Sequence, residues 1–125
     1  MTVRTCLLVS DDPDDHVEIT EAIYEIADDI VVFVVSDARR AASLLLSKRH
    51  IPDYFIVDIG VNGFTHDHFF SSLKTDSEYK SMFVLAYGDA SEFENLRLDG
   101  ISAFMERDTS YSVIRDFLRK VIVRG

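Results

Sequence analysis

The sequence predicts a single doubly wound α/β domain with a five-stranded parallel sheet, and three observations lead to this prediction. The 125-residue chain is 47% hydrophobic and 28% charged, with 5 Gly and 2 Pro, which is typical of one domain with a real core. Short apolar blocks rich in β-branched and aromatic residues recur along it, and their continuous apolarity indicates strands buried on both faces. Helical patterns separate these blocks, and such alternation is typical of parallel sheets with right-handed crossovers.

The predicted strands are the apolar blocks that turn or acidic residues bound on each side. They cover Val3–Val9, Ile30–Val35, Tyr54–Val57, Met82–Tyr87 and Ile101–Met105. For five such strands the common doubly wound order is 2-1-3-4-5, the flavodoxin-like arrangement. Ligands bind these sheets beyond the carboxyl ends of the strands, at the topological switch point between the first and third strands. A functional site is therefore expected at that edge.

Five helices are predicted between and after the strands. The first begins at Asp12-Pro13, because an acidic N-cap precedes a proline at the first helical position. Asp14 and Asp15 follow and complement the positive end of the helix dipole. The other helices start at Ser36 or Asp37, cover His66–Lys74 and Ala90–Leu98, and start at Thr109 or Ser110.

Charge and cysteine content exclude several classes of function. The 13 Lys and Arg against 22 Asp and Glu give a net charge of −9, which argues against nucleic acid as a partner because phosphate contacts need a basic face. The single Cys excludes a disulfide framework and a thiolate zinc site made by one chain. No apolar run approaches the roughly 18 residues of a membrane span, and none fits a signal peptide. We therefore expect a cytoplasmic protein with no membrane partner.

Carboxylates gather at the predicted binding edge. The first strand ends in Ser10-Asp11-Asp12 and the third in Asp58. Packed carboxylates repel one another, so such a cluster needs a cation, a raised pKa or access to solvent. Carboxylate oxygens with a backbone carbonyl and water suit Mg²⁺, and an Asp beside Mg²⁺ can act as a nucleophile that forms an aspartyl-phosphate. The alternative is that Asp11 and Asp12 only cap a helix and that Asp58 only ends a strand.

The motifs LLVSDDPDD, YFIVD and AYG, in this order, resemble the receiver domain of two-component response regulators, and the likeness in element order runs the full length of the chain. The resemblance implies that Ser10 and Asp11 occupy the family's acidic pair and that Asp58 is the phosphoacceptor. It further implies that Mg²⁺ is held by Asp11, Asp58 and the backbone carbonyl of Gly60. Ser10 would then reach the metal weakly, through water.

Several positions depart from the family's pattern, and three of them belong to the expected site. Ser10 replaces an acid, Arg107 replaces the lysine that contacts the phosphoryl group, and Tyr87 replaces a Thr or Ser, or Gly88 does if the register shifts by one residue. Arginine keeps the charge and can hold a phosphoryl group bidentately, but it is bulkier. By the same resemblance Phe104 is the switch aromatic. We expect the Tyr87 ring to fill the space into which Phe104 would turn, because packed interiors do not absorb an extra ring.

The resemblance implies a stand-alone receiver over residues 1–125, with no output domain and no enzymatic activity of its own. It would accept a phosphoryl group on Asp58 from a histidine kinase or phosphotransfer protein and signal by binding a downstream protein. A homodimer through the face made by the fourth and fifth strands and helices is a further expectation.

Two alternatives remain open. The first is a pseudo-receiver, an interaction module independent of phosphorylation, which the replacements at Ser10, Tyr87 and Arg107 favour. The second is a phosphatase with Asp58 as nucleophile. Haloacid-dehalogenase-like enzymes need a second Asp two residues on, where this chain has Gly60.

The remaining candidate ligands have structural interpretations. His66-Asp67-His68 has no third ligand at helical spacing and is interpreted as a solvated helix start. His16 and His50 are isolated and are interpreted as surface or cap residues. Cys6 lies within the first strand and is interpreted as a buried thiol.

Overall fold

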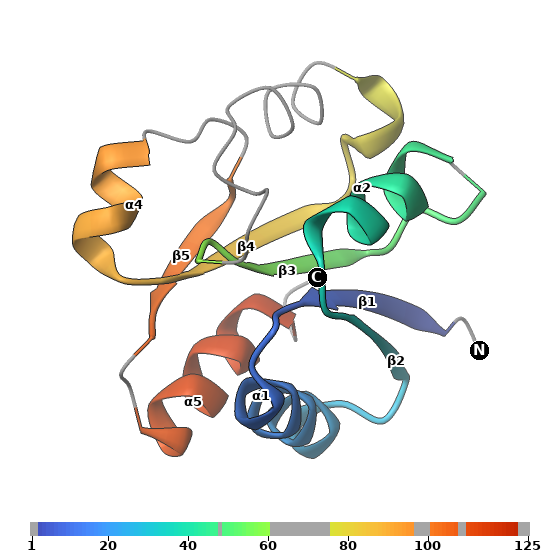
Figure 1. The fold of residues 1–125 in the computed structure, drawn as a ribbon. Coiled ribbons are helices and arrows are strands. Elements are labelled where there is room, and N and C mark those ends of the chain that lie inside the picture. The colour runs from blue at the N-terminus through green and yellow to red at the C-terminus, as the bar shows by residue number, and fades with distance from the viewer. Residues whose placement is uncertain (1–2, 48, 61–75, 97–100, 108–109, 123–125) are drawn as a thin grey trace.

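The computed structural model describes residues 3–47, 49–60, 76–96, 101–107 and 110–122, over which strands and helices alternate (Figure 1). The strands are β1 (Arg4–Val9), β2 (Ile30–Val35), β3 (Tyr54–Asp58), β4 (Phe83–Gly88) and β5 (Ala103–Glu106). The helices are α1 (Pro13–Ile26), α2 (Ala38–Leu46), α4 (Ala90–Leu96) and α5 (Tyr111–Ile122), with a 3-10 turn, η1 (Ser77–Tyr79), before β4.

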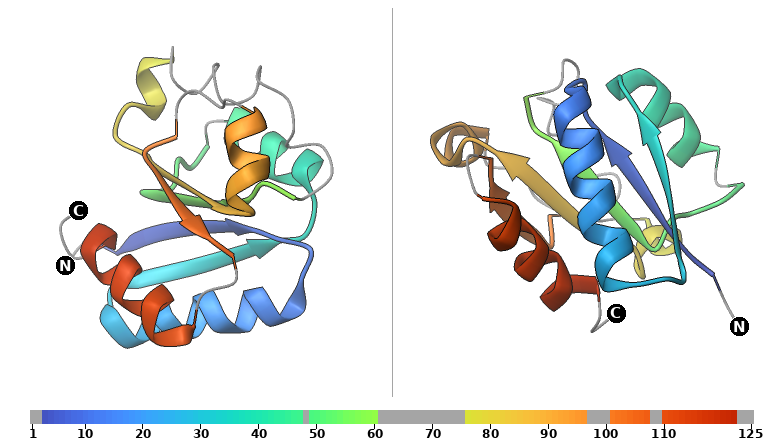
Figure 2. Two further views of the ribbon diagram at one scale, coloured as in Figure 1. Left: turned by 90° about the vertical axis from the view of Figure 1, so that its left-hand side faces the viewer. Right: turned by 90° about the horizontal axis from the view of Figure 1, so that it is seen from below.

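The strands form one parallel sheet in the order β2-β1-β3-β4-β5. Helices α1 and α5 cover one face of the sheet, and α2 and α4 lie on the other (Figures 1 and 2). The predicted doubly wound fold and its strand order are therefore confirmed. Strands β1 and β3 are adjacent in the sheet, and their carboxyl ends border the site predicted from the sequence.

Two apolar layers, one on each face of the sheet, account for the continuous apolar runs of the strands. On the α1–α5 side, Leu8 and Ile56 pack against Ile23 and Leu118, and all four are almost fully buried. The other layer contains Leu7, Val9, Phe55 and Val57 from the same two strands and Leu45 from α2. Cys6 is also fully buried, and burial raises the pKa of its thiol to about 12, which confirms the structural interpretation of this residue.

Polar caps fix where the helices begin. The Asp12 side chain accepts a hydrogen bond from the Asp14 amide at 2.9 Å, so the predicted N-cap of α1 is confirmed. Asp37, rather than Ser36, caps α2 by accepting from the Arg40 amide at 2.7 Å. Helix α5 begins directly after Ser110.

The expected third helix, His66–Lys74, lies outside the described residues, and so does the His66-Asp67-His68 cluster. The fourth expected helix is found over Ala90–Leu96, and residues 97 and 98 are likewise not described. None of the described helices combines the length and the apolarity that crossing a membrane requires.

Candidate functional site

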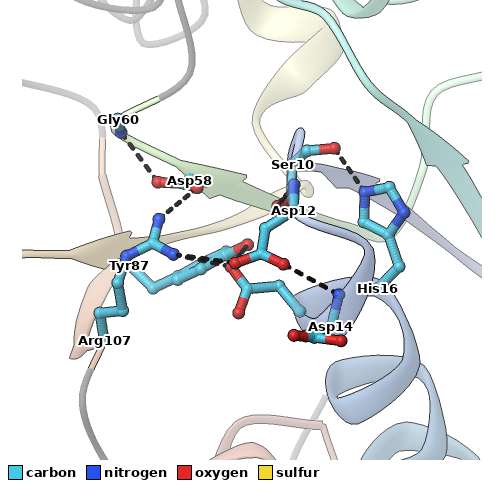
Figure 3. Close-up of polar contacts among 9 residues, drawn as sticks. Ser10, Asp12, Asp14, His16, Asp58, Gly60, Tyr87 and Arg107 are labelled. Carbon is cyan, nitrogen blue, oxygen red and sulfur yellow. Dashed lines mark hydrogen bonds and ion pairs between the residues drawn. The ribbon is translucent and has the colours of Figure 1, made fainter.

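The candidate site lies at the carboxyl edge of the sheet, where side chains from several strands and from the start of α1 come together (Figure 3). Ser10 follows β1, Asp58 is the last residue of β3, and Arg107 follows β5. Tyr87 in β4 is the direct neighbour of Asp58 in the β3–β4 register. The parallel sheet therefore gathers residues that are far apart in the sequence around one carboxylate, that of Asp58.

Asp58 is a buried carboxylate that is fully engaged by neighbours. Its side chain is about 2% exposed. One oxygen, Oδ1, accepts a hydrogen bond from the Gly60 amide at 2.8 Å, and the other, Oδ2, is in direct contact with the Arg107 guanidinium. A buried carboxylate is costly unless it is paired and hydrogen-bonded, and Arg107 and the Gly60 amide supply both kinds of partner to Asp58.

Arg107 bridges Asp58 to the first turn of α1. Its second terminal nitrogen, Nη1, donates to Asp15 Oδ2 at 2.8 Å and lies 4.0 Å from Asp12 Oδ2. Hydrogen bonding to Asp58, followed by the charges of Asp58 and Asp15, raises the pKa of Arg107 above its ordinary value. The planar guanidinium suits this role because its two terminal nitrogens can donate hydrogen bonds to two carboxylates at once.

Asp15 is a site residue that the sequence analysis interpreted only as a complement to the helix dipole. Burial raises the pKa of Asp15, Arg107 opposes this rise, and the nearby charges of Asp12 and Asp58 add to it. Because the folded-state pKa is raised, the contribution of this group to stability is present at low pH and is lost as the pH rises through that pKa. The sequence does contain a signal for this role of Asp15. Asp15 stands about one helical turn after Asp12, so the two carboxylates face the same side of the start of α1.

Tyr87 lies on the α1–α5 side of the sheet. Its hydroxyl donates to Asp15 at 3.3 Å, and the Arg107 guanidinium carbon lies 5.5 Å from the centre of its ring. Burial raises the pKa of the Tyr87 hydroxyl well above its ordinary value, so this group acts as a neutral donor. The Tyr87 ring therefore packs in the α1–α5 layer next to Arg107 and does not face Phe104.

Phe104 packs on the opposite face, so the expectation that Tyr87 fills the space beside it is wrong. Phe104 belongs with the layer under α2 and α4, and its ring stacks on Phe93 of α4 with centroids 4.2 Å apart. Its partner in the β4–β5 register is Ala86, whereas Tyr87 pairs with Met105. Side chains alternate between faces along a strand, so the small residue beside Phe104 is Ala86, one position before the expected one.

Gly88, the other residue considered for the hydroxyl position, has no room for a side chain. Its φ is +153°, and a Cβ at this position would lie 2.6 Å from Ile59 Cγ1. A Ser or Thr at position 88 would therefore require both an unusual backbone conformation and displacement of Ile59.

The β1–α1 loop is held by side chains that reach back toward the strand. The Ser10 hydroxyl is fully buried and accepts from the Asp12 amide at 3.1 Å, while Asp11 is exposed at the bend after β1. His16 is not an isolated surface or cap residue, because its ring nitrogen Nε2 contacts the Ser10 carbonyl. Helical side chains point toward the N-terminus of their helix, which is why a residue one turn into α1 reaches the loop before it.

Among the described residues, negative charge is in excess at this edge of the sheet. Asp12, Asp15 and Asp58 place three carboxylates around the single guanidinium of Arg107, which leaves an excess of negative charge. Within the described part of the chain, no group of three or more His, Cys, Asp or Glu side chains is arranged to hold a metal ion. An open site with two carboxylates, a carbonyl and waters is the kind that Mg²⁺ uses. A cation at this place would compete with Arg107 for Asp58.

Comparison with known proteins gives the fold its name. No family model and no curated protein matches the sequence. Solved structures of response regulators do match. The chemotaxis response regulator CheY4 of Vibrio cholerae has 17% identity and a TM-score of 0.73 over 97% of this chain and 100% of its own. The phosphorylated cyanobacterial phytochrome response regulator RcpA has 17% identity and a TM-score of 0.73, with 96% and 91% covered.

A third similar structure is the Mn²⁺-bound form of response regulator Rcp1, with 12% identity and a TM-score of 0.71 over 94% of this chain and 91% of that one. At such low identity the likeness establishes the fold. The chain therefore has the receiver fold of response regulators, as the sequence motifs indicated.

Proposed function

We propose that this chain is a receiver module of two-component signalling in which Asp58 accepts a phosphoryl group. The observation that supports this best is the contact between Arg107 and the buried carboxylate of Asp58 at the carboxyl end of β3. In the proposed transfer, an Asp58 oxygen attacks the phosphorus of a phosphohistidine on a histidine kinase or phosphotransfer protein. A P–O bond forms, the P–N bond breaks, and the imidazole leaves with its bonding electron pair.

Neighbouring residues position the groups for this step. The Gly60 amide holds Asp58 Oδ1, which orients the carboxylate. Asp15 holds Nη1 of Arg107, so the guanidinium remains at the site when its other nitrogen transfers from Asp58 to the phosphoryl oxygens. Mg²⁺, when bound, would neutralise charge on the phosphoryl oxygens. We assign its binding to Asp11, Asp58 and the Gly60 carbonyl, with Ser10 contributing through water.

A phosphorylation-independent interaction module is the second candidate, and one observation favours it. Both oxygens of Asp58 already have partners and the residue is 1% exposed, so a phosphodonor must displace Arg107 before the carboxylate can react. In either case, we propose that the chain signals by binding another protein and not by catalysing a reaction.

Phosphorylation distinguishes the two candidates. With acetyl phosphate and Mg²⁺, we expect the intact mass of the protein to rise by one phosphoryl group. Asp58→Asn should abolish this gain because the nucleophile is removed. Asp12→Asn serves as the matched control, since Asn also caps a helix, and it should retain the gain. A wild-type protein that gains no mass under conditions that label an active receiver would support the second candidate instead.

Metal binding tests the assigned ligands separately. We expect weak Mg²⁺ binding by calorimetry, because Ser10 stands where the family has an acid. Ser10→Asp adds a carboxylate beside Asp11 and should tighten binding by about tenfold, since ligand charge tunes the affinity of such sites. Ser36→Asp adds the same charge after β2, which β1 separates from β3 and Asp58, and should change little. Equal effects of the two substitutions would contradict the ligand assignment.

A further inference from the structure

A second concave feature lies on the α2 side of the sheet, away from Asp58. It is a groove of about 300 Å³ between β2 and α2. Leu7 and Leu45, both buried, form its floor, and Phe33 and Leu44 form its walls. The two wall residues are 51% and 46% exposed, although both are large and apolar. Figure 2 shows β2 as the outermost strand, with α2 beside it.

The edge of the sheet next to this groove is unusually apolar. Strand β2 has the sequence IVVFVV, and among the described strands it pairs only with β1. Edge strands of soluble proteins are commonly protected by charged residues or proline, and this strand has neither. Val31, two residues before Phe33, faces the same side of the sheet and is also exposed. Contiguous exposed apolar surface of this kind marks interaction sites in soluble proteins.

The rim of the groove is basic, in contrast to the rest of the chain. Arg49 lines the groove and Arg40 lies beside it, whereas the whole chain has a net charge of −9. Arg49 and His50 line the groove directly, and His50 is held there by a 2.9 Å hydrogen bond to the Thr5 hydroxyl. Arg40 is exposed one helical turn before Leu44 and therefore lies on the same side of α2.

We propose that this groove binds an acidic amphipathic helix of a partner protein. An apolar side chain of that helix would insert between Phe33 and Leu44, in the helix-in-groove mode of recognition. Its Asp and Glu residues would face Arg40 and Arg49, and neither arginine has an ion pair with another described residue. This charge pattern selects an acidic partner and steers its approach. The interaction does not require phosphorylation of Asp58.

A designed peptide tests the proposal directly. The probe is a fluorescein-labelled peptide of about 14 residues, close to four helical turns, with Leu or Phe at every third or fourth position and Asp or Glu between them. A matched peptide carries Lys in place of each acid. We expect the full chain to bind the acidic peptide by fluorescence anisotropy and to bind the basic one at least about tenfold more weakly. Raising the ionic strength from about 0.05 M to about 0.3 M should weaken binding.

Neighbouring residues on α2 supply matched controls. Arg40→Glu and Leu44→Ser alter the groove side of the helix, and each should weaken peptide binding by about tenfold. Arg39→Glu and Leu46→Ser alter exposed residues on its other side and should have less than about a twofold effect. All four positions are exposed, so the variants should keep the wild-type circular dichroism spectrum and melting temperature.

Three results would overturn the proposal. The first is failure of the wild-type chain to bind the acidic peptide, or equal binding of both peptides. The second is an equal loss of binding in the groove variants and in their controls. The third is self-association of the wild-type chain in sedimentation that Leu44→Ser abolishes, because the groove would then be covered by a second copy of this chain.

Discussion

Replacing Arg107 with Met is expected to lower the free energy of unfolding by about 3 kcal/mol, because removal of one partner from a buried ion pair leaves the other charge uncompensated. Among the described residues, only the Gly60 amide would still donate a hydrogen bond to Asp58, which is almost fully buried. Met preserves most of the apolar stem of the arginine, so the change reports on charge rather than on packing. Urea denaturation followed by circular dichroism measures the effect.

A second substitution separates this explanation from general damage to the loop after β5. Asp58→Asn removes the buried charge, so the Arg107→Met/Asp58→Asn double variant should be more stable than Arg107→Met alone. Arg119→Met is the matched control, because Arg119 is half-exposed and pairs with Asp116 at 3.8 Å on the surface. Such exposed pairs contribute less than about 1 kcal/mol. An Arg107→Met variant as stable as Arg119→Met would show that the bridge to Asp58 carries little energy.

The same ion pair connects stability to the proposed function. In the proposed transfer, phosphorylation of Asp58 would remove the carboxylate charge that Arg107 contacts and supply phosphoryl oxygens in its place. Because Asp15 also binds Arg107, the guanidinium can change partners at one end while it is held at the other. Under the proposed function, the ion pairs by which Arg107 connects α1 to β3 would rearrange on phosphorylation. In the phosphorylation-independent alternative, the same bridge is a permanent structural link.

Much of this site could be predicted because parallel sheets place the ends of their strands at one edge. Apolar runs located the strands, and their order then brought Asp58 close to the loop after Ser10. The cap at Asp12 was predictable for a similar reason, since capping depends on local sequence. Arg107 could be placed beside Asp58 only through the resemblance to a family, because no local pattern links residues 49 positions apart.

Side-chain direction was less predictable. The sequence placed Tyr87 beside Phe104, but an error of one residue along a strand moves a side chain to the other face of the sheet. The end of β4 contains Ala86, Tyr87 and Gly88 in a row, so apolarity does not distinguish the faces there. The sequence did not reveal the contacts of Asp15 with Arg107 and of His16 with Ser10, because these contacts depend on how α1 is rotated against the sheet. An acidic residue in the first turn also suits any helix, so Asp15 did not stand out.

Gly88→Ala is expected to cost about 2–3 kcal/mol of unfolding free energy, and it tests the conclusion that no side chain fits at the end of β4. Two effects contribute, namely the positive φ of +153° and a contact of 2.6 Å between the new Cβ and Ile59 Cγ1. Ile59 is fully buried and so cannot swing into solvent. Gly60→Ala is the control, because a Cβ there would have a nearest contact of 3.2 Å, to Asp58 Oδ1. It should cost less than half as much.

A double variant distinguishes the steric part of this cost from the backbone part. Ile59→Ala removes both atoms that a Cβ at position 88 approaches most closely, at 2.6 and 3.1 Å, and by itself should cost about 2–5 kcal/mol as a buried truncation. If the clash dominates, Gly88→Ala should add almost nothing in the Ile59→Ala background, and thermal or urea unfolding should reveal the favourable coupling. Strict additivity would assign the cost to the backbone instead. A Gly88→Ala variant as stable as the wild type would reopen position 88 as a place for a hydroxyl group.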